Sequence, residues 1–210
     1  MISLLFSNPL IFFIAFGGLI ISLTIHEFAH AWTADKLGDP TPRLQGRVTL
    51  DPRAHLDPLG TVMILLTRFG WGKPVQFDPY NLKHPVRDSA IIALAGPASN
   101  LLLAGVLSLI LYLQILPFTL LEFAFAQIIV TNVVLAIFNL VPVYPLDGSK
   151  ILVALLPKEA AFDYDRFMSQ YGIFVLLALI FPWYQGMAPI SFLISPVIQF
   201  MTSFLLPSIL

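Results

Sequence analysis

The sequence predicts an all-α polytopic membrane protein with about five crossing helices, and three observations lead to this fold class. Of the 210 residues, 58% are hydrophobic and only 11% are charged, whereas a soluble domain carries about 25% charged residues. Several apolar stretches reach the roughly 20 residues that a helix needs to cross a bilayer. The basic residues gather in connections that these stretches would place on one side.

Composition also excludes several functional classes. The chain has no cysteine, which excludes disulfide bonds, a thiolate metal site and a cysteine nucleophile. The net charge of −1 gives no indication of a nucleic-acid partner. We expect contact with the lipid bilayer and with membrane proteins instead.

The first crossing helix is predicted over residues 9–36. Asn8 can cap it and Pro9 suits its first turn. The sequence Gly38-Asp39-Pro40 ends it. The N-terminal stretch has no basic region and no A-x-A cleavage motif, so we expect it to remain in the mature protein.

A polar region follows, in which we expect a small β-hairpin or strand region within residues 43–80. The strand candidates are residues 47–50 and the sequence GKPVQF at 72–77. Between them, residues 59–69 are apolar but too short to cross a bilayer. We therefore expect a re-entrant or buried helix there.

The rest of the chain alternates long apolar stretches with short connections. The predicted elements are crossings at about 89–116, 122–142, 166–182 and 189–207 and a short helix at 147–156. We find no internal repeat, and no polar stretch is long enough for an appended domain of ordinary size. The prediction is a single integral-membrane domain over residues 1–210, with its core motifs at 26–152.

The basic residues predict the orientation. They lie at positions 36, 43, 47, 53, 68, 73, 83, 87, 150, 158 and 166. These spans put all of them at one membrane face, and the opposite connections, 117–122 and 182–189, carry none. The positive-inside rule then predicts a multi-pass cell-membrane protein with its basic loops in the cytoplasm and its N-terminus outside.

The sequence HEFAH near the end of the first crossing carries the clearest chemistry. His26 and His30 are four residues apart, so they share one helix face. Two such imidazoles can bind one zinc ion, and Glu27 can then act as general base on the water. The alternative is a histidine pair hydrogen-bonded within a helix bundle. Ionisable groups inside a membrane favour a functional role.

A catalytic zinc site needs a third protein ligand and an open position. The best candidate is Asp147 in the sequence NLVPVYPLDGSKIL, which follows a crossing helix and two prolines. Its carboxylate can reach a metal, or it can cap the next short helix. The depths of His26 and Asp147 below the basic face are compatible with one shared ion.

Three motifs in order, HEFAH at 26–30, GPASN at 96–100 and NLVPVYPLDG at 139–148, resemble the site-2 protease family of intramembrane zinc metalloproteases. The likeness is to the small prokaryotic branch without a PDZ domain. It implies one zinc ion per chain, held by His26, His30 and Asp147, with Glu27 as the catalytic base. It also implies cleavage of a membrane-spanning protein substrate in or near its transmembrane segment, which must be extended to be cut.

Four further polar side chains have two interpretations each. Asn100 can bind a substrate backbone or an oxyanion, or it can join helices through a polar contact. Asn139 has the same alternatives, and a structural role is favoured there. His55 can lie beside the site, although we expect a solvated loop histidine. His84 has still less support for a role.

Two other functions compete with proteolysis. A membrane metal-ion transporter also places His and Glu on helices, but its path needs polar groups along the whole crossing. The outer halves of these helices carry almost none. A non-catalytic relative that binds membrane proteins is the other alternative, and the intact Glu27 argues against it.

Overall fold

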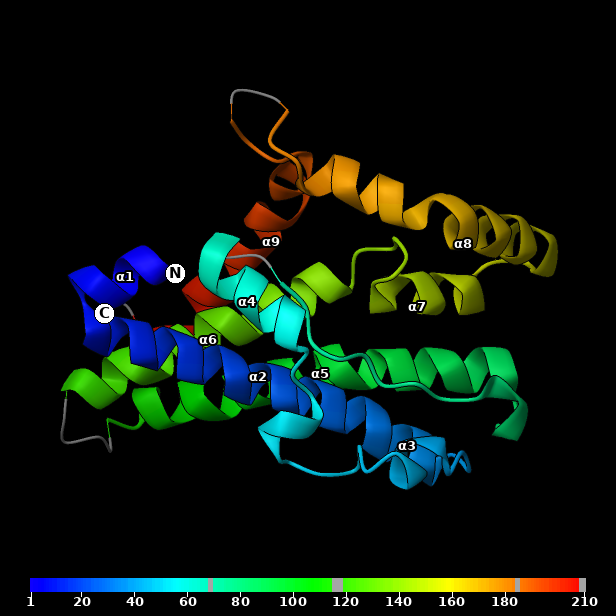
Figure 1. Ribbon diagram of the computed structural model, residues 1–210, viewed down its shortest axis with the longest axis horizontal. Helices are drawn as coiled ribbons and strands as arrows, with labels where there is room; N and C mark the ends of the chain where they lie inside the picture. Colours follow the sequence, from blue (N-terminus) through cyan, green and yellow to red (C-terminus); the bar gives the residue numbers. More distant parts are fainter. Residues whose placement is uncertain (68–69, 115–118, 184–185, 208–210) are drawn as a thin grey trace.

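The computed structural model describes residues 1–67, 70–114, 119–183 and 186–207. These residues are mostly helical, as predicted (Figure 1). The helices in chain order are α1 (Ile2–Ser7), α2 (Pro9–Lys36), α3 (Thr41–Leu44), η1 (Pro52–Ala54), α4 (Pro58–Thr67), η2 (Pro79–Asn81), α5 (Pro85–Tyr112), α6 (Thr119–Asn139), α7 (Asp147–Leu155), α8 (Lys158–Ile180) and α9 (Pro189–Leu205). Arg68 and parts of the connections 117–122 and 182–189, which entered the orientation argument, lie outside the described residues.

Three long helices form the centre of the molecule. α2, α5 and α6 pack against one another, and each is long and apolar enough to cross a membrane. α2 has the predicted bounds, and its first turn is capped by the Asn8 side chain, which accepts a hydrogen bond from the Ile11 N–H at 3.2 Å. α5 begins earlier than predicted, at Pro85, because a proline fits the first helical position.

Buried apolar side chains join α5, α6 and α9. The cluster consists of Ala104, Leu111, Ile129 and Val133, with partly buried side chains of α9 packed against it. Ile129 and Val133 of α6 are fully buried. A second cluster joins the α6–α7 connection to α8 and α9. The C-terminal helices are therefore attached to the bundle through α6 and α7.

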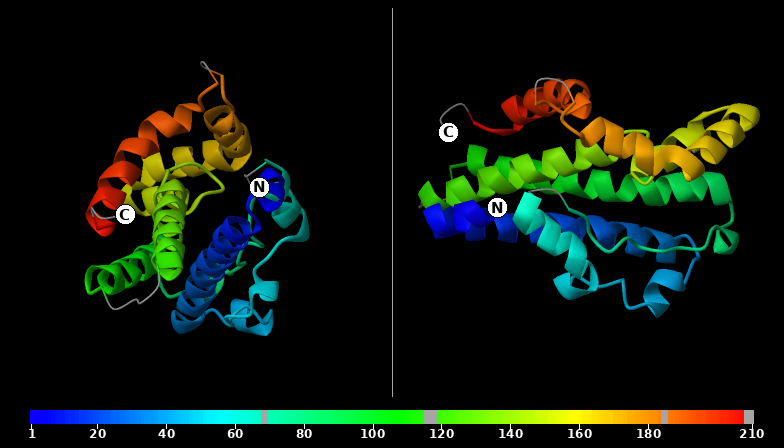
Figure 2. Two further views of the ribbon diagram at one scale, coloured as in Figure 1. Left: turned by 90° about the vertical axis from the view of Figure 1, so that its left-hand side faces the viewer. Right: turned by 45° about the horizontal axis from the view of Figure 1, so that its top comes forward.

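The prediction of a fifth crossing is not borne out by the path of α8 and α9. Tyr112, at the end of α5, donates a hydrogen bond from its hydroxyl to the Phe204 carbonyl at 3.2 Å. The C-terminal end of α9 therefore lies beside the C-terminal end of α5. The prediction placed it at the opposite membrane face, near Pro85. α8 and α9 run one after the other toward the C-terminal end of α5, close to the N-terminus of the chain (Figures 1 and 2). α4 is short, as predicted.

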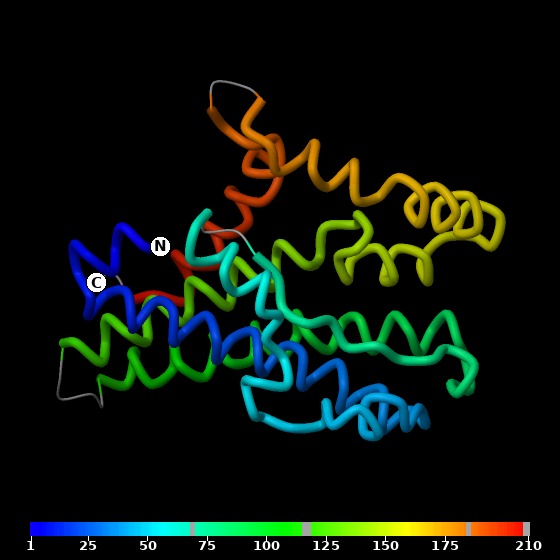
Figure 3. The backbone as a smooth tube through the Cα atoms, in the orientation of Figure 1, coloured from blue at the N-terminus to red at the C-terminus, as the bar shows by residue number. Residues whose placement is uncertain are grey.

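The predicted strand region is also different. Leu56 and Gly72 form an isolated antiparallel bridge, and no longer strand forms among the described residues. Pro74 has no N–H and cannot continue a ladder, and the Val75 N–H donates instead to the Glu27 carboxylate. Residues 73–78, which we call the extended segment, form neither helix nor strand and run alongside α5 (Figure 3).

Replacing Ile129 by alanine should destabilise the bundle, because the lost side chain leaves a cavity between tightly packed helices. We expect a loss of about 2 kcal/mol or more. The matched control is Val134→Ala on the same helix, where the side chain is 40% exposed and the expected change is within about 0.5 kcal/mol. Thermal unfolding in detergent measures both. Equal melting temperatures for the two variants would contradict this core.

Candidate metal centre

His26 and His30 lie one turn apart on α2 and turn their rings toward the same point. Their Nε2 atoms are 3.0 Å apart. Both side chains are buried, with 3% and 7% of their surface exposed. The helical spacing predicted this shared face, and the structure places it against α5 in the middle of the bundle.

Asp147 reaches the same point from the far end of the α6–α7 connection. Its Oδ2 atom lies 3.2 Å from His26 Nε2 and 3.3 Å from His30 Nε2. The alternative role as a helix cap does not match the geometry, because Leu146 occupies the cap position of α7 and Asp147 is its first residue. One ligand atom from each of the three residues lies within 4.8 Å of the others.

The outer nitrogen of each imidazole is fixed by a neighbour. His26 Nδ1 lies 2.6 Å from Asn100 Oδ1. This oxygen must accept, because the Asn100 amide nitrogen donates both its protons, to the Ser22 carbonyl at 3.0 Å and to Asn132 Oδ1 at 2.7 Å. His30 Nδ1 lies 2.6 Å from the Ile92 carbonyl. Both Nδ1 atoms therefore carry the proton in the neutral ring.

These tautomers leave three acceptors facing one another. The two Nε2 atoms carry lone pairs, and the Asp147 Oδ2 atom is buried without a hydrogen-bond donor. Three converging acceptors repel one another unless a proton or a metal cation lies between them. Two imidazole nitrogens and one carboxylate oxygen are also a ligand set that suits a divalent metal ion. The residues present therefore fit a metal centre.

A buried amide network supports the histidine pair. Asn132 is fully buried, and its amide nitrogen donates to Ser22 Oγ at 2.8 Å and to the Ile128 carbonyl at 2.8 Å. Asn100 is also fully buried, and its amide contacts His26, Ser22 and Asn132. These contacts match the helix-joining interpretation of Asn100. Sequence reasoning missed Asn132, although an amide inside an apolar span signals such a network.

Gly96 allows α5 to approach the histidines. A Cβ atom at this position would lie 2.4 Å from His30 Nε2 and 2.6 Å from His26 Cε1. Real Cβ atoms do not approach other heavy atoms so closely, so only glycine fits between the helix backbone and the two rings. The close packing of α5 on the two histidines thus explains why the GPASN motif begins with glycine.

Glu27 lies beside the histidines but is held by a different part of the chain. Its Oε2 atom accepts a hydrogen bond from the Val75 N–H at 3.1 Å, and Arg47 Nη2 lies 3.9 Å away. Oε1 has no hydrogen-bond partner among the described residues. The carboxylate lines a cavity of about 130 Å³, together with His26, His30, Asn139, Asp147 and Lys150.

The polar loop after α2 is folded against the site, and one expectation about it is wrong. His55 is fully buried rather than solvated, with Nε2 2.7 Å from the Thr49 carbonyl. Burial lowers its pKa, which keeps the ring neutral. Arg47 is also buried and donates to the Lys73 carbonyl. The loop thereby holds the extended segment that contacts Glu27.

Asp39 binds the other end of the extended segment. Sequence reasoning did not find this role of Asp39. Its carboxylate is fully buried and accepts from the Asp78 N–H at 2.7 Å and the Asn81 amide at 2.8 Å. Burial alone would raise its pKa, but the hydrogen bonds from Thr41, Asn81 and the backbone hold the pKa below its usual value. The group is therefore ionised at neutral pH.

The two remaining candidates have no partner in the metal centre. Asn139 lines the cavity, but its amide nitrogen donates to the Leu135 carbonyl of its own helix at 2.9 Å. His84 is exposed at the start of α5 and makes no capping bond with its side chain. Asn139 thus has the structural contact that the sequence favoured.

Replacing Gly96 by alanine should remove metal binding while leaving the helices folded, because the new methyl group displaces the two imidazoles. The control is Gly105→Ala on the same helix, where a Cβ atom has no neighbour within 4 Å. Elemental analysis of purified protein gives the metal content, and circular dichroism gives the helix content. Full metal content in the Gly96 variant would contradict the close approach of α5.

Several known proteins are similar to this chain. Residues 116–179 match the family model for Peptidase family M50. "Putative zinc metalloprotease YwhC" from Bacillus subtilis is 41% identical over 169 residues, which cover 77% of each chain. "Putative zinc metalloprotease Rip2" from Mycobacterium tuberculosis is 32% identical over 71% of this chain and 60% of its own length. A Rip2 protein from Mycolicibacterium smegmatis is 35% identical over 103 residues.

None of the solved structures matches the chain. The identity to YwhC extends over more than two thirds of both proteins, and the family match covers the segment that carries Asp147. The protein therefore belongs to peptidase family M50, the site-2 protease family that its three motifs resemble.

Proposed function

We propose that the protein is an intramembrane zinc endopeptidase that cuts a peptide bond in or near a transmembrane segment of a substrate protein. The observation that carries this proposal is the convergence of Nε2 of His26, Nε2 of His30 and Oδ2 of Asp147 at one point, beside the carboxylate of Glu27. The names of the relatives, which describe zinc metalloproteases, support the choice of metal.

His26, His30 and Asp147 would hold one zinc ion, and a fourth position would remain open toward the cavity. Zinc in such a site lowers the pKa of a bound water to about 7 and polarises the carbonyl of the scissile bond. Asn100 and the Ile92 carbonyl orient the two imidazoles so that Nε2 of each points inward. Such supporting contacts are worth about 10- to 100-fold in metal affinity.

Glu27 acts as the general base and then as the general acid. Oε2 is held by the Val75 N–H, which leaves Oε1 to accept a proton from the attacking water. The same carboxyl passes the proton to the amine that leaves. Proton transfer of this kind contributes roughly 10²- to 10⁴-fold to the rate. Because Val75 belongs to the extended segment, this segment sets the direction in which the base points.

The substrate must be extended where it is cut, because the hydrogen bonds and side chains of a helix close its peptide bonds to attack. A groove of about 640 Å³ lies between the extended segment, α5, α7 and α8. Its volume falls within the range of about 300–1,000 Å³ that is typical of ligand sites. Val75 and Phe77 line both this groove and the smaller cavity with the metal ligands.

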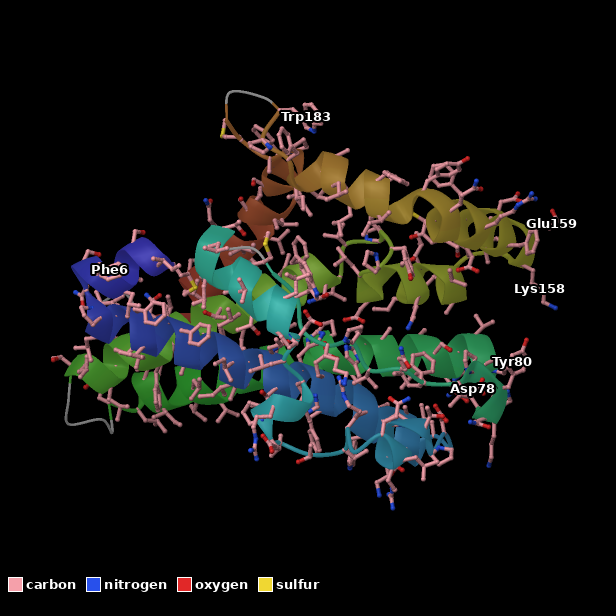
Figure 4. The ribbon with its side chains drawn as sticks, in the orientation of Figure 1. Phe6, Asp78, Tyr80, Lys158, Glu159 and Trp183 are labelled. Atoms are coloured by element: carbon pink, nitrogen blue, oxygen red, sulfur yellow. The ribbon has the colours of Figure 1, made fainter. Side chains whose placement is uncertain are left out.

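We propose that the chain is a single domain that crosses the cell membrane several times, with its N-terminus outside. α2, α5 and α6 supply three crossings, and α8 with α9 would supply a further one. The charged residues Lys158, Glu159 and Asp78 lie at one end of the molecule, opposite to Phe6 near the N-terminus (Figure 4). The positive-inside rule assigns the charged end, with the groove, to the cytoplasm.

Glu27→Gln should keep the zinc ion and lose cleavage of a membrane substrate in liposomes by a factor of roughly 10² or more. The amide keeps the shape of the side chain but cannot take a proton. Asp147→Ala should lose both cleavage and metal, because it removes a ligand.

Elemental analysis and gel-based cleavage give the two readouts for each variant. Cleavage by the Glu27 variant at the rate of the unmodified protein would remove this residue as the base. Full zinc content in the Asp147 variant would remove the proposed metal centre.

A further inference from the structure

Lys150 stands where the groove meets the cavity of the metal ligands. It lines both spaces, together with Val75 and Phe77. It follows Asp147 by three residues on α7, so both side chains lie on the same face of that helix. The Lys150 ammonium lies over the Phe77 ring, 4.3 Å from its centre.

No carboxylate among the described residues lies within the 4.0 Å of an ion pair with this ammonium group, and Asp147 directs Oδ2 at the histidines. Burial lowers the pKa of Lys150, and the more distant carboxylates of Asp147 and Glu27 oppose that shift. The Lys150 side chain remains accessible to solvent. An aromatic face holds an ammonium group without neutralising it, so the charge stays available to a ligand in the groove.

The groove is otherwise mostly apolar, and its two charged side chains lie at different places along it. Its described lining contains one further charged residue, Asp165 of α8, which does not line the smaller cavity. Within the groove, Lys150 therefore lies at the boundary with the smaller cavity, whereas Asp165 lines the groove alone. An extended peptide with an acidic side chain near the cleaved bond complements this arrangement.

We infer that Lys150 recognises an acidic side chain of the substrate segment that occupies the groove, close to the bond that is cut. The inference rests on the proposed function, since it deepens the choice of substrate at the same site. Lys150 is a specificity-determining residue in this account. It selects an Asp or Glu residue within an otherwise apolar, extended segment and takes no part in proton transfer.

A binding assay tests this without turnover. The protein carries Glu27→Gln, is loaded with zinc and is held in zwitterionic nanodiscs, so that anionic lipid headgroups do not compete. The probes are fluorescent peptides of about ten residues, apolar except for one Asp, which is moved along the series. Each peptide has a partner with Asn in the same place.

We expect an Asp peptide to bind about fivefold more tightly than its Asn partner at one position of the series, the size of a partly exposed ion pair. Lys150→Met should bring this ratio to about one, and Lys150→Glu should reverse it. The control is Lys158→Met, an exposed lysine at the start of α8 that lines neither space, and it should keep the fivefold ratio.

Three outcomes overturn the inference. They are equal affinity for every Asp and Asn pair, an unchanged ratio in Lys150→Met, and a preference that is the same at all positions. Loss of affinity for both peptides in Lys150→Met would show that the side chain only packs on Phe77, which also overturns it. Cleavage of a neutral membrane substrate is measured separately, so failure of the proposed function is distinguishable from failure of this inference.

Discussion

The metal centre depends on one constraint, which is the direction of two imidazole rings on α2. Each ring uses Nδ1 to contact α5, through Asn100 for His26 and through the Ile92 carbonyl for His30. The packing of α5 against α2 thereby decides which nitrogen remains free to bind a metal. The amide network from Asn100 to Asn132 extends this constraint to α6, so the three long helices hold the site together.

The same site also depends on irregular backbone. The Val75 N–H, which a β-ladder would have used, holds Glu27 instead. Buried Arg47 and Asp39 fasten the extended segment at its two ends through the Lys73 carbonyl and the Asp78 N–H. Non-helical backbone is tolerated inside membrane proteins where protein or a water-filled cavity satisfies its polar groups. Here those partners are charged side chains of the polar loop.

Much of this arrangement was predictable because it depends on local patterns. Helical spacing places His26 and His30 on one face, and the two prolines before Asp147 mark the break that brings a carboxylate back to them. The direction of α9 was not predictable, because apolar length does not say toward which face a helix runs. The burial of His55 depends on the tertiary contact of its loop, which leaves no signal in a short polar sequence.

The third residue of the candidate metal centre comes late in the chain. Asp147 follows His26 and His30 by more than a hundred residues and belongs to a helix that packs on α5 and α8. A nascent chain that ends after α6 has the histidine pair and Glu27 but lacks the third residue of the cluster. The three-residue cluster is thus completed only after α7 has been synthesised and has packed against α5.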